Sequence, residues 1–135
     1  MRVKNSTTFD TSYLRKLAVA VKPERCTKVE VVFKHFSQIH VAGQAWNDVL
    51  IKVPRLWGVF PYQYKEGDGY LGVMVYTREE ELVYVLAHEF RHVWQSLVPR
   101  GWRVWGAGKS GASERDADAY GLQMLRRYRR GELKM

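Results

Sequence analysis

Two histidines flank a glutamate in residues 88–92, which read His-Glu-Phe-Arg-His. On a helix, four residues advance the side-chain direction by about 40°, so His88 and His92 project from one face and can bind one metal ion through ring nitrogens. Glu89 points toward the same metal, where its carboxylate can take a proton from a bound water. Zinc suits this pattern because coordination lowers the pKa of water to about 7. The residues predict one zinc ion (Zn2+) per chain, with Glu89 as general base.

A third ligand is expected from a carboxylate downstream. Glu114 opens a predicted helix and shares a face of it with Ala117 and Asp118. Packing that face against the helix of His88 and His92 would carry the Glu114 carboxylate to the metal. Two histidines and one glutamate leave zinc one open coordination position. Asp118, one turn later, is a candidate to accept the second ring N–H of His88 or His92 and so fix its tautomer.

Three helices are predicted to position these residues, at about 12–21, at about 77–97 and from Ser113 to just before Gly131. The second has the clearest start, because Thr77 as N-cap and Glu80 three residues later form a capping box. Ser113 is the expected N-cap of the third helix. The residues that could bind the metal therefore lie on the second and third helices.

Extended segments fill most of the chain between the first two helices. Apolar and polar residues alternate in residues 29–34, as in a half-buried strand. A second extended region is expected in residues 49–64, interrupted by prolines and glycine, and a last strand in residues 70–76. The pattern predicts an α+β fold, and the length of 135 residues fits a single domain, 1–135.

The two motifs together resemble a known family. After a loop, residues 114–120 read Glu-Arg-Asp-Ala-Asp-Ala-Tyr. With the upstream His-Glu-x-x-His, this resembles the gluzincin metallopeptidases, and in particular the minimal single-domain gluzincins and the ImmA/IrrE-type proteins. Their second motif reads like Glu-x-Glu-Ala-Asp/Asn-x-Phe-Ala, from which Asp116 and Tyr120-Gly121 depart conservatively. The resemblance covers residues 77–125.

The resemblance implies a zincin-like fold, with a small, mostly antiparallel sheet, three main helices and an active-site helix at about 77–97. It implies a zinc-dependent peptidase that cleaves a peptide or protein substrate. The site residues that it implies are the zinc ligands His88, His92 and Glu114, the base Glu89, and Asp118 behind the ligands. In this family an extended peptide pairs with a strand edge near the site, and residues 70–76 are our candidate for part of that sheet.

Composition limits the class and the location of the protein. The chain is 46% hydrophobic and 27% charged, as in ordinary globular proteins, and no apolar run approaches the roughly 20 residues of a membrane span. Cys26 is the only cysteine, which excludes an internal disulfide and agrees with a reducing compartment. The basic N-terminus is not followed by the apolar stretch of a secretory signal. We therefore expect a cytoplasmic protein.

Other functions remain open. The net charge of +8 favours anionic partners, and a nucleic-acid-binding module could use tryptophans and basic residues of the loop between the last two helices: Arg100, Trp102, Arg103, Trp105 and Lys109. We prefer to interpret this loop as a rim or lid over the metal. A third possibility is a structural zinc site or a sensor without general protease activity.

Two further families with the same first motif fit less well. The surroundings of Cys26 do not match the cysteine motif of peptide deformylase, and no histidine follows His92 as in the SprT-type proteases. Hydrolysis also requires a donor to stabilise the oxyanion. The sequence leaves six candidates for that role, His40, Tyr70, Tyr76, Arg100, Arg103 and Tyr120.

Overall fold

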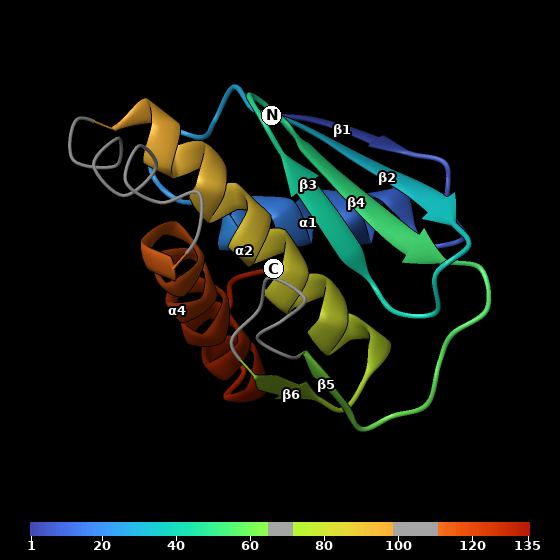
Figure 1. Ribbon diagram of the computed structural model, residues 1–135. Helices are drawn as coiled ribbons and strands as arrows, with labels where there is room; N and C mark the ends of the chain where they lie inside the picture. Colours follow the sequence, from blue (N-terminus) through green and yellow to red (C-terminus); the bar gives the residue numbers. More distant parts are fainter. Residues whose placement is uncertain (65–71, 99–110) are drawn as a thin grey trace.

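This computed structural model describes residues 1–64, 72–98 and 111–135, which contain three helices, a four-stranded sheet and a two-stranded hairpin (Figure 1). The helices are α1 (Thr11–Val21), α2 (Arg78–Leu97) and α4 (Gly111–Arg129). The sheet contains β1 (Arg2–Asn5), β2 (Glu30–Phe36), β3 (Ala42–Ala45) and β4 (Val49–Pro54). The hairpin consists of β5 (Tyr62–Tyr64) and β6 (Val73–Val75). The α+β class predicted from the sequence is confirmed.

The sheet is mostly parallel, so the prediction of a mostly antiparallel sheet was wrong. Its strand order is β1-β2-β4-β3; β2 pairs in parallel with both β1 and β4, and only the β3–β4 pair is antiparallel. The reason is β1 and β3, which the sequence did not predict. Because α1 connects β1 to β2, the chain returns to the sheet in its original direction and these two strands run in parallel. Because β3 lies beyond β4 and pairs with it in antiparallel, β4 returns in the direction of β2.

Of residues 70–76, the structure describes residues 72–76, and these lie outside the four-stranded sheet. Among them, β6 pairs with β5 in the separate hairpin, where Tyr62 lies opposite Val75 and Tyr64 opposite Val73. The segment predicted to be part of the peptide-binding sheet therefore lies, in its described part, in a separate hairpin, and the binding of a peptide stays a prediction. The strands at the two edges of the four-stranded sheet are β1 and β3.

Both upstream helices begin where the sequence predicts. Asp10 accepts a hydrogen bond from the backbone N–H of Tyr13 at 2.9 Å, and Thr77 accepts one from that of Glu80 at 3.1 Å. The Glu80 carboxylate accepts from the backbone N–H of Tyr76 instead of that of Thr77, so the predicted capping box is shifted by one residue.

The third helix begins earlier than predicted. Because α4 starts at Gly111, Ser113 lies inside the helix, and its predicted role as N-cap was wrong. The helix ends close to the expected point. Gly131 follows it with φ of 69°, a left-handed conformation that suits glycine.

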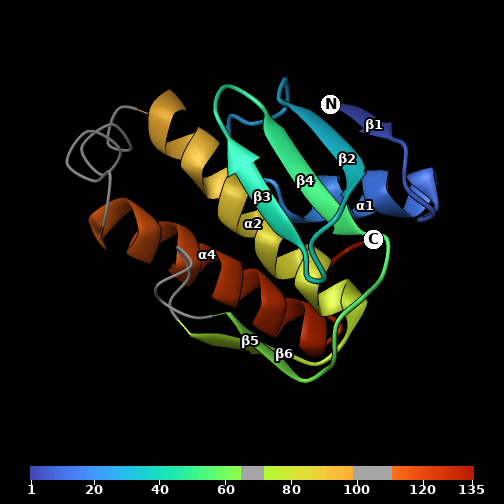
Figure 2. The same cartoon turned by 45° about the vertical axis from the view of Figure 1, so that its right-hand side comes forward.

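Helix α2 lies between the sheet and α4, and the hairpin lies near its N-terminal end (Figures 1 and 2). It packs against β3 and β4 on one side and α4 on the other. The sheet residues Val31, Phe33, Val49 and Ile51 are fully buried, whereas their neighbours in the strands are partly exposed. One face of the sheet therefore contacts the core. Among the described helices, none is both long and apolar enough to cross a membrane.

A glycine brings α4 close to α2. A Cβ atom at Gly121 would lie 3.0 Å from two ring carbons of Tyr84 and 3.1 Å from the Tyr84 carbonyl oxygen. Tyr84 is fully buried, so its ring has little space to move. The close approach matters for the site, because α4 carries Glu114.

We predict that Gly121→Val destabilises the protein by about 1–3 kcal/mol, because the added side chain overpacks this contact. Thermal unfolding of the variant would measure the effect. Ala119→Val is the matched control, since Ala119 is exposed on the same helix. Equal melting temperatures for the two variants would contradict the packing role of Gly121.

Candidate metal centre

The middle of α2 holds His88 and His92 inside the molecule. His88 is 2% exposed and His92 is 7% exposed, because α2 is covered by the sheet and by α4. One helical turn separates the two residues, and their Nε2 atoms lie 3.2 Å apart. The predicted pair of imidazoles on one helix face is therefore present.

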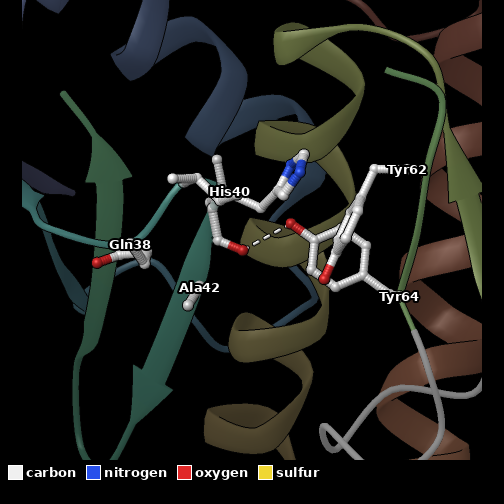
Figure 3. Close-up of a pocket in the computed structure, with 7 residues that line it drawn as sticks. Gln38, His40, Ala42, Tyr62 and Tyr64 are labelled. Atoms are coloured by element: carbon white, nitrogen blue, oxygen red, sulfur yellow. Dashed lines mark hydrogen bonds between the residues drawn. The ribbon is translucent and has the colours of Figure 1, made fainter. Parts of the chain in front are cut away.

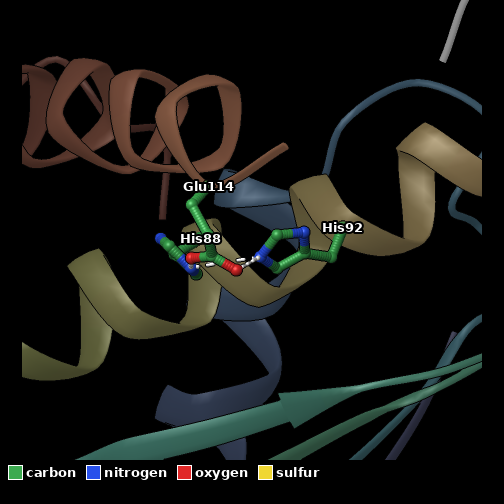
Figure 4. A group of neighbouring side chains, drawn as sticks. All are labelled: His88, His92 and Glu114. Atoms are coloured by element: carbon green, nitrogen blue, oxygen red, sulfur yellow. Dashed lines mark hydrogen bonds and ion pairs between the residues drawn. The ribbon is translucent and has the colours of Figure 1, made fainter. Parts of the chain in front are cut away.

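Glu114 joins the pair from α4 (Figure 4). Its Oε2 atom lies 3.1 Å from Nε2 of His88, and its Oε1 atom lies 3.1 Å from Nε2 of His92. In the described part of the chain, these three residues form a group whose ligand atoms all lie within 4.8 Å of one another. The structure thus brings together the three ligands predicted from the sequence.

The spacing of these atoms fits a tetrahedral metal ion. With metal–ligand bonds of 2.0–2.1 Å, neighbouring ligand atoms of a tetrahedron lie about 3.3 Å apart. The Nε2 atoms of His88 and His92, 3.2 Å apart, are close to this value, and each lies 3.1 Å from a different oxygen of Glu114. Two imidazole nitrogens and a carboxylate are also a donor set that binds zinc. The arrangement is a candidate metal site, and the identity of the metal is a matter for experiment.

The charges of the three groups depend on burial and on each other. Burial lowers the pKa of His88 below its ordinary value. For His92, burial also lowers the pKa, but hydrogen bonding to Glu114 and the charge of Glu89 outweigh it and raise the pKa. Burial alone would raise the pKa of Glu114, yet its hydrogen bonds with the two histidines lower it to about 2. Glu114 therefore offers an ionised carboxylate to a cation.

Glu89 lies beside the three candidate ligands. Its Oε1 atom is 4.0 Å from Nε2 of His88, and burial raises the pKa of its carboxyl group to about 7. Such a group can accept and return a proton near neutral pH. On its other side is β3: a Cβ atom at Gly43 would lie 2.5 Å from Cγ of Glu89. Only glycine allows the strand to pass this close.

Asp118 is buried on α4, one turn after Glu114. For His92, however, the partner of Nδ1 is Gln95, whose Oε1 atom lies 3.0 Å away. The predicted contact of Asp118 with a metal-binding histidine therefore stays a prediction, and it now concerns His88.

Gln95 was not among the site residues predicted from the sequence, and neither were Asp116 and Arg91, which are linked to it by hydrogen bonds. Gln95 donates to Asp116, which also accepts two hydrogen bonds from Arg91. Burial raises the pKa of Asp116, but the bonds from Arg91 and Gln95 outweigh it and lower the pKa. The spacing contained a signal, because Gln95 is three residues after His92 and seven after His88, on the same helix face.

Two of the described candidates for the oxyanion donor bond to other groups. Tyr120 donates to the carbonyl of Val21 at 2.6 Å, and Nδ1 of His40 bonds to Glu81. Tyr76 is 57% exposed. The remaining candidates, Tyr70, Arg100 and Arg103, lie outside the described residues, as do Trp102, Trp105 and Lys109 of the proposed nucleic-acid-binding loop.

A cavity of about 260 Å³ lies at the start of β3, between residues 38–42 and the side chains of Tyr62 and Tyr64 (Figure 3). Its wall is fixed by Glu81, which is fully buried and accepts from the backbone N–H of Val41 at 2.8 Å. The hydroxyl of Tyr64 donates to the carbonyl of Val41 at 2.6 Å. The cavity is mostly apolar and adjoins the strand that passes Glu89.

Comparison of the chain with models of known protein families, with curated proteins and with solved structures gives no match. Inferences about function therefore rest on the geometry of this site and on the motifs.

Proposed function

We propose that this protein is a zinc-dependent metallopeptidase of the gluzincin type. The observation that carries the proposal is the convergence of His88, His92 and Glu114, with the buried carboxylate of Glu89 next to them. Two histidines and a carboxylate can also bind ferrous iron. The carboxylate of Glu89 beside these ligands favours zinc and hydrolysis, because a water bound to zinc would be activated by losing a proton to such a base.

A zinc ion at these ligands supplies an acidic water and polarises the substrate carbonyl. Glu89, buried beside these ligands, would take the proton of the attacking water and deliver it to the leaving amine. Burial of Glu89 and of the two histidines excludes bulk water around the carboxylate. These residues perform the proton transfers of amide hydrolysis.

Strand β3 is the proposed binding edge for an extended peptide. It pairs with β4 alone within the four-stranded sheet, so its other edge can pair with a peptide backbone. Gly43 places this strand against Glu89. The apolar cavity adjoins the first residue of β3, Ala42, and offers space for a substrate side chain close to the bond that is cleaved.

The test of the proposal is cleavage of an unstructured protein, such as casein, by the purified chain. We expect cleavage that stops with a zinc chelator and returns when zinc is restored. Cleavage that a chelator does not affect would contradict the proposal, as would no cleavage of casein or of a peptide library by zinc-loaded protein. If zinc-loaded protein cleaves neither casein nor the peptide library, the alternatives of a zinc-binding sensor or a nucleic-acid-associated protein would gain support.

We predict that Gly43→Val lowers kcat/KM by about 100-fold, because displacement of a catalytic group by about 1 Å has effects of that size. The new Cβ would lie 2.5 Å from Cγ of Glu89 and 3.2 Å from Val85, so the carboxylate must move. Zinc content should stay at one per chain, since the three atoms nearest to the new Cβ belong to Glu89 and Val85 and not to a candidate ligand. Ala119→Val is again the control, and equal activity of the two variants would contradict the role of Gly43.

A further inference from the structure

Gln95 connects the two helices that carry the candidate ligands. It lies on α2 and is fully buried. Its Nε2 atom donates to the carbonyl of Ser113 at 3.0 Å and to Oδ2 of Asp116 at 2.9 Å, both on α4. Its Oε1 atom lies 3.0 Å from Nδ1 of His92. A single amide group therefore contacts a candidate ligand on one side and the helix of Glu114 on the other.

The partners on α4 determine which end of the amide faces His92. A primary amide has two N–H donors and one carbonyl acceptor. The Ser113 carbonyl and the Asp116 carboxylate can only accept, so the amide nitrogen must face them and the oxygen must face His92. Because that oxygen cannot donate, Nδ1 of His92 must carry the proton of this hydrogen bond.

The proton on Nδ1 determines which atom of His92 is available to a metal. A neutral imidazole carries one N–H and one lone pair, so the lone pair is then on Nε2. Nε2 is the atom that faces Glu114 and His88, at 3.1 Å and 3.2 Å. In the protonated ring Nε2 donates to the Glu114 carboxylate, and in the neutral ring the hydrogen bond to Gln95 keeps the proton on Nδ1 and leaves the Nε2 lone pair for a metal.

Asp116 is itself held in place. Nε and Nη2 of Arg91 donate to its two oxygens at 2.8 Å and 3.2 Å, and the guanidinium carbon lies 3.5 Å from the centre of the Trp94 ring. This pair of bonds fixes the plane of the carboxylate that accepts from Gln95. Arg91 therefore orients Asp116, Asp116 orients the Gln95 amide, and the Gln95 amide orients His92.

We propose that Gln95 is a positioning residue for the metal ligand His92, and that it fixes the correct tautomer only when α4 is docked. Both groups that orient its amide belong to the first turns of α4, which also carries Glu114. When α4 docks on α2, it therefore brings Glu114 to the site and, through Gln95, fixes the tautomer of His92. The inference rests on the metal site of the proposed function, but not on peptide hydrolysis.

The test compares zinc affinity in Gln95→Met, which keeps the length of the side chain but loses its hydrogen bonds. We expect zinc to bind about 10- to 100-fold more weakly, as is typical when a partner behind a metal-binding histidine is lost. Asp116→Asn is the second variant. The asparagine amide can donate to Gln95 as well as accept from it, so residue 116 would no longer require the Gln95 nitrogen to face α4. Gln123→Met is the matched control, since Gln123 is exposed on α4.

A second readout separates positioning from general stability. In zinc-loaded protein labelled with ¹⁵N at its histidine rings, NMR should show a protected Nδ1 proton on His92. In Gln95→Met this proton should exchange faster with water. A zinc affinity within twofold of wild type, or an unchanged Nδ1 proton, in a folded Gln95→Met variant would overturn the proposal.

The same titrations distinguish the possible failures. If wild-type protein binds zinc and His88→Ala does not, the metal site is established whether or not peptides are cleaved. An unaffected Gln95→Met variant would then refute the role of Gln95 alone. If wild-type protein binds no zinc, both the proposed function and this inference fail.

Discussion

Glu89→Gln should abolish peptide cleavage while zinc remains bound. Glutamine has nearly the same shape as glutamate, so the variant keeps the packing against Gly43 and His88. It cannot accept the proton of the attacking water, and a general base contributes about 10²- to 10⁴-fold to the rate. We therefore expect kcat/KM to fall by about that factor. Steady-state kinetics on a cleaved peptide would measure the loss, and metal analysis would measure the zinc.

Glu24→Gln is the control for this change, because Glu24 is exposed. It should retain wild-type activity. Loss of zinc from Glu89→Gln would show that Glu89 acts as a ligand and would contradict its assignment as base. Retained cleavage in a zinc-loaded variant would show that another group accepts the proton.

The second large effect is expected at the third ligand. In Glu114→Gln, an ionised carboxylate between two imidazoles becomes a neutral amide, which is a poor ligand for zinc. Zinc affinity should fall by more than the roughly 10- to 100-fold expected for Gln95→Met, since a direct bond to the metal is lost. Competition with a chromophoric chelator would measure both affinities under the same conditions.

This order of effects separates a ligand from a residue that orients a ligand. Glu24→Gln again serves as the control and should bind zinc like the wild type. An affinity for zinc in Glu114→Gln equal to that of the wild type would place the third ligand elsewhere. The cluster of His88, His92 and Glu114 would then be a set of buried hydrogen bonds.

The elements that carry the motifs could be predicted because their local signals are strong. Helix α2 has a capping threonine and a long apolar period, and its observed start agrees with the prediction. The approach of Glu114 to the histidines followed from the face of α4 on which it lies. The period of each helix placed its side chains on a face, and the expectation that these two faces pack together supplied the contact.

The missed elements have weak local signals. Strand β1 contains one apolar residue in four, and β3 reads Ala-Gly-Gln-Ala, a composition with little preference for strands. Their pairing is determined by tertiary contacts. Without β1 and β3, neither the parallel connection through α1 nor the parallel pair of β2 and β4 could be recognised. The direction of the sheet was therefore predicted incorrectly.

The role of Gln95 was hidden for a similar reason. Its position on the histidine face of α2 is visible in the sequence, but its partners Ser113 and Asp116 lie on another helix. The orientation of its amide follows only when all three contacts are known. Such outer contacts of a site depend on how two helices dock, which a single sequence does not specify.

The central claim is that His88, His92 and Glu114 hold one zinc ion. X-ray absorption spectroscopy of the purified, zinc-loaded protein tests it most directly. We predict one zinc per chain, with two imidazole nitrogens and oxygen ligands at about 2.0–2.1 Å. A sulfur ligand at about 2.3 Å, which only Cys26 or a methionine could supply within one chain, or the absence of stoichiometric zinc would contradict the claim.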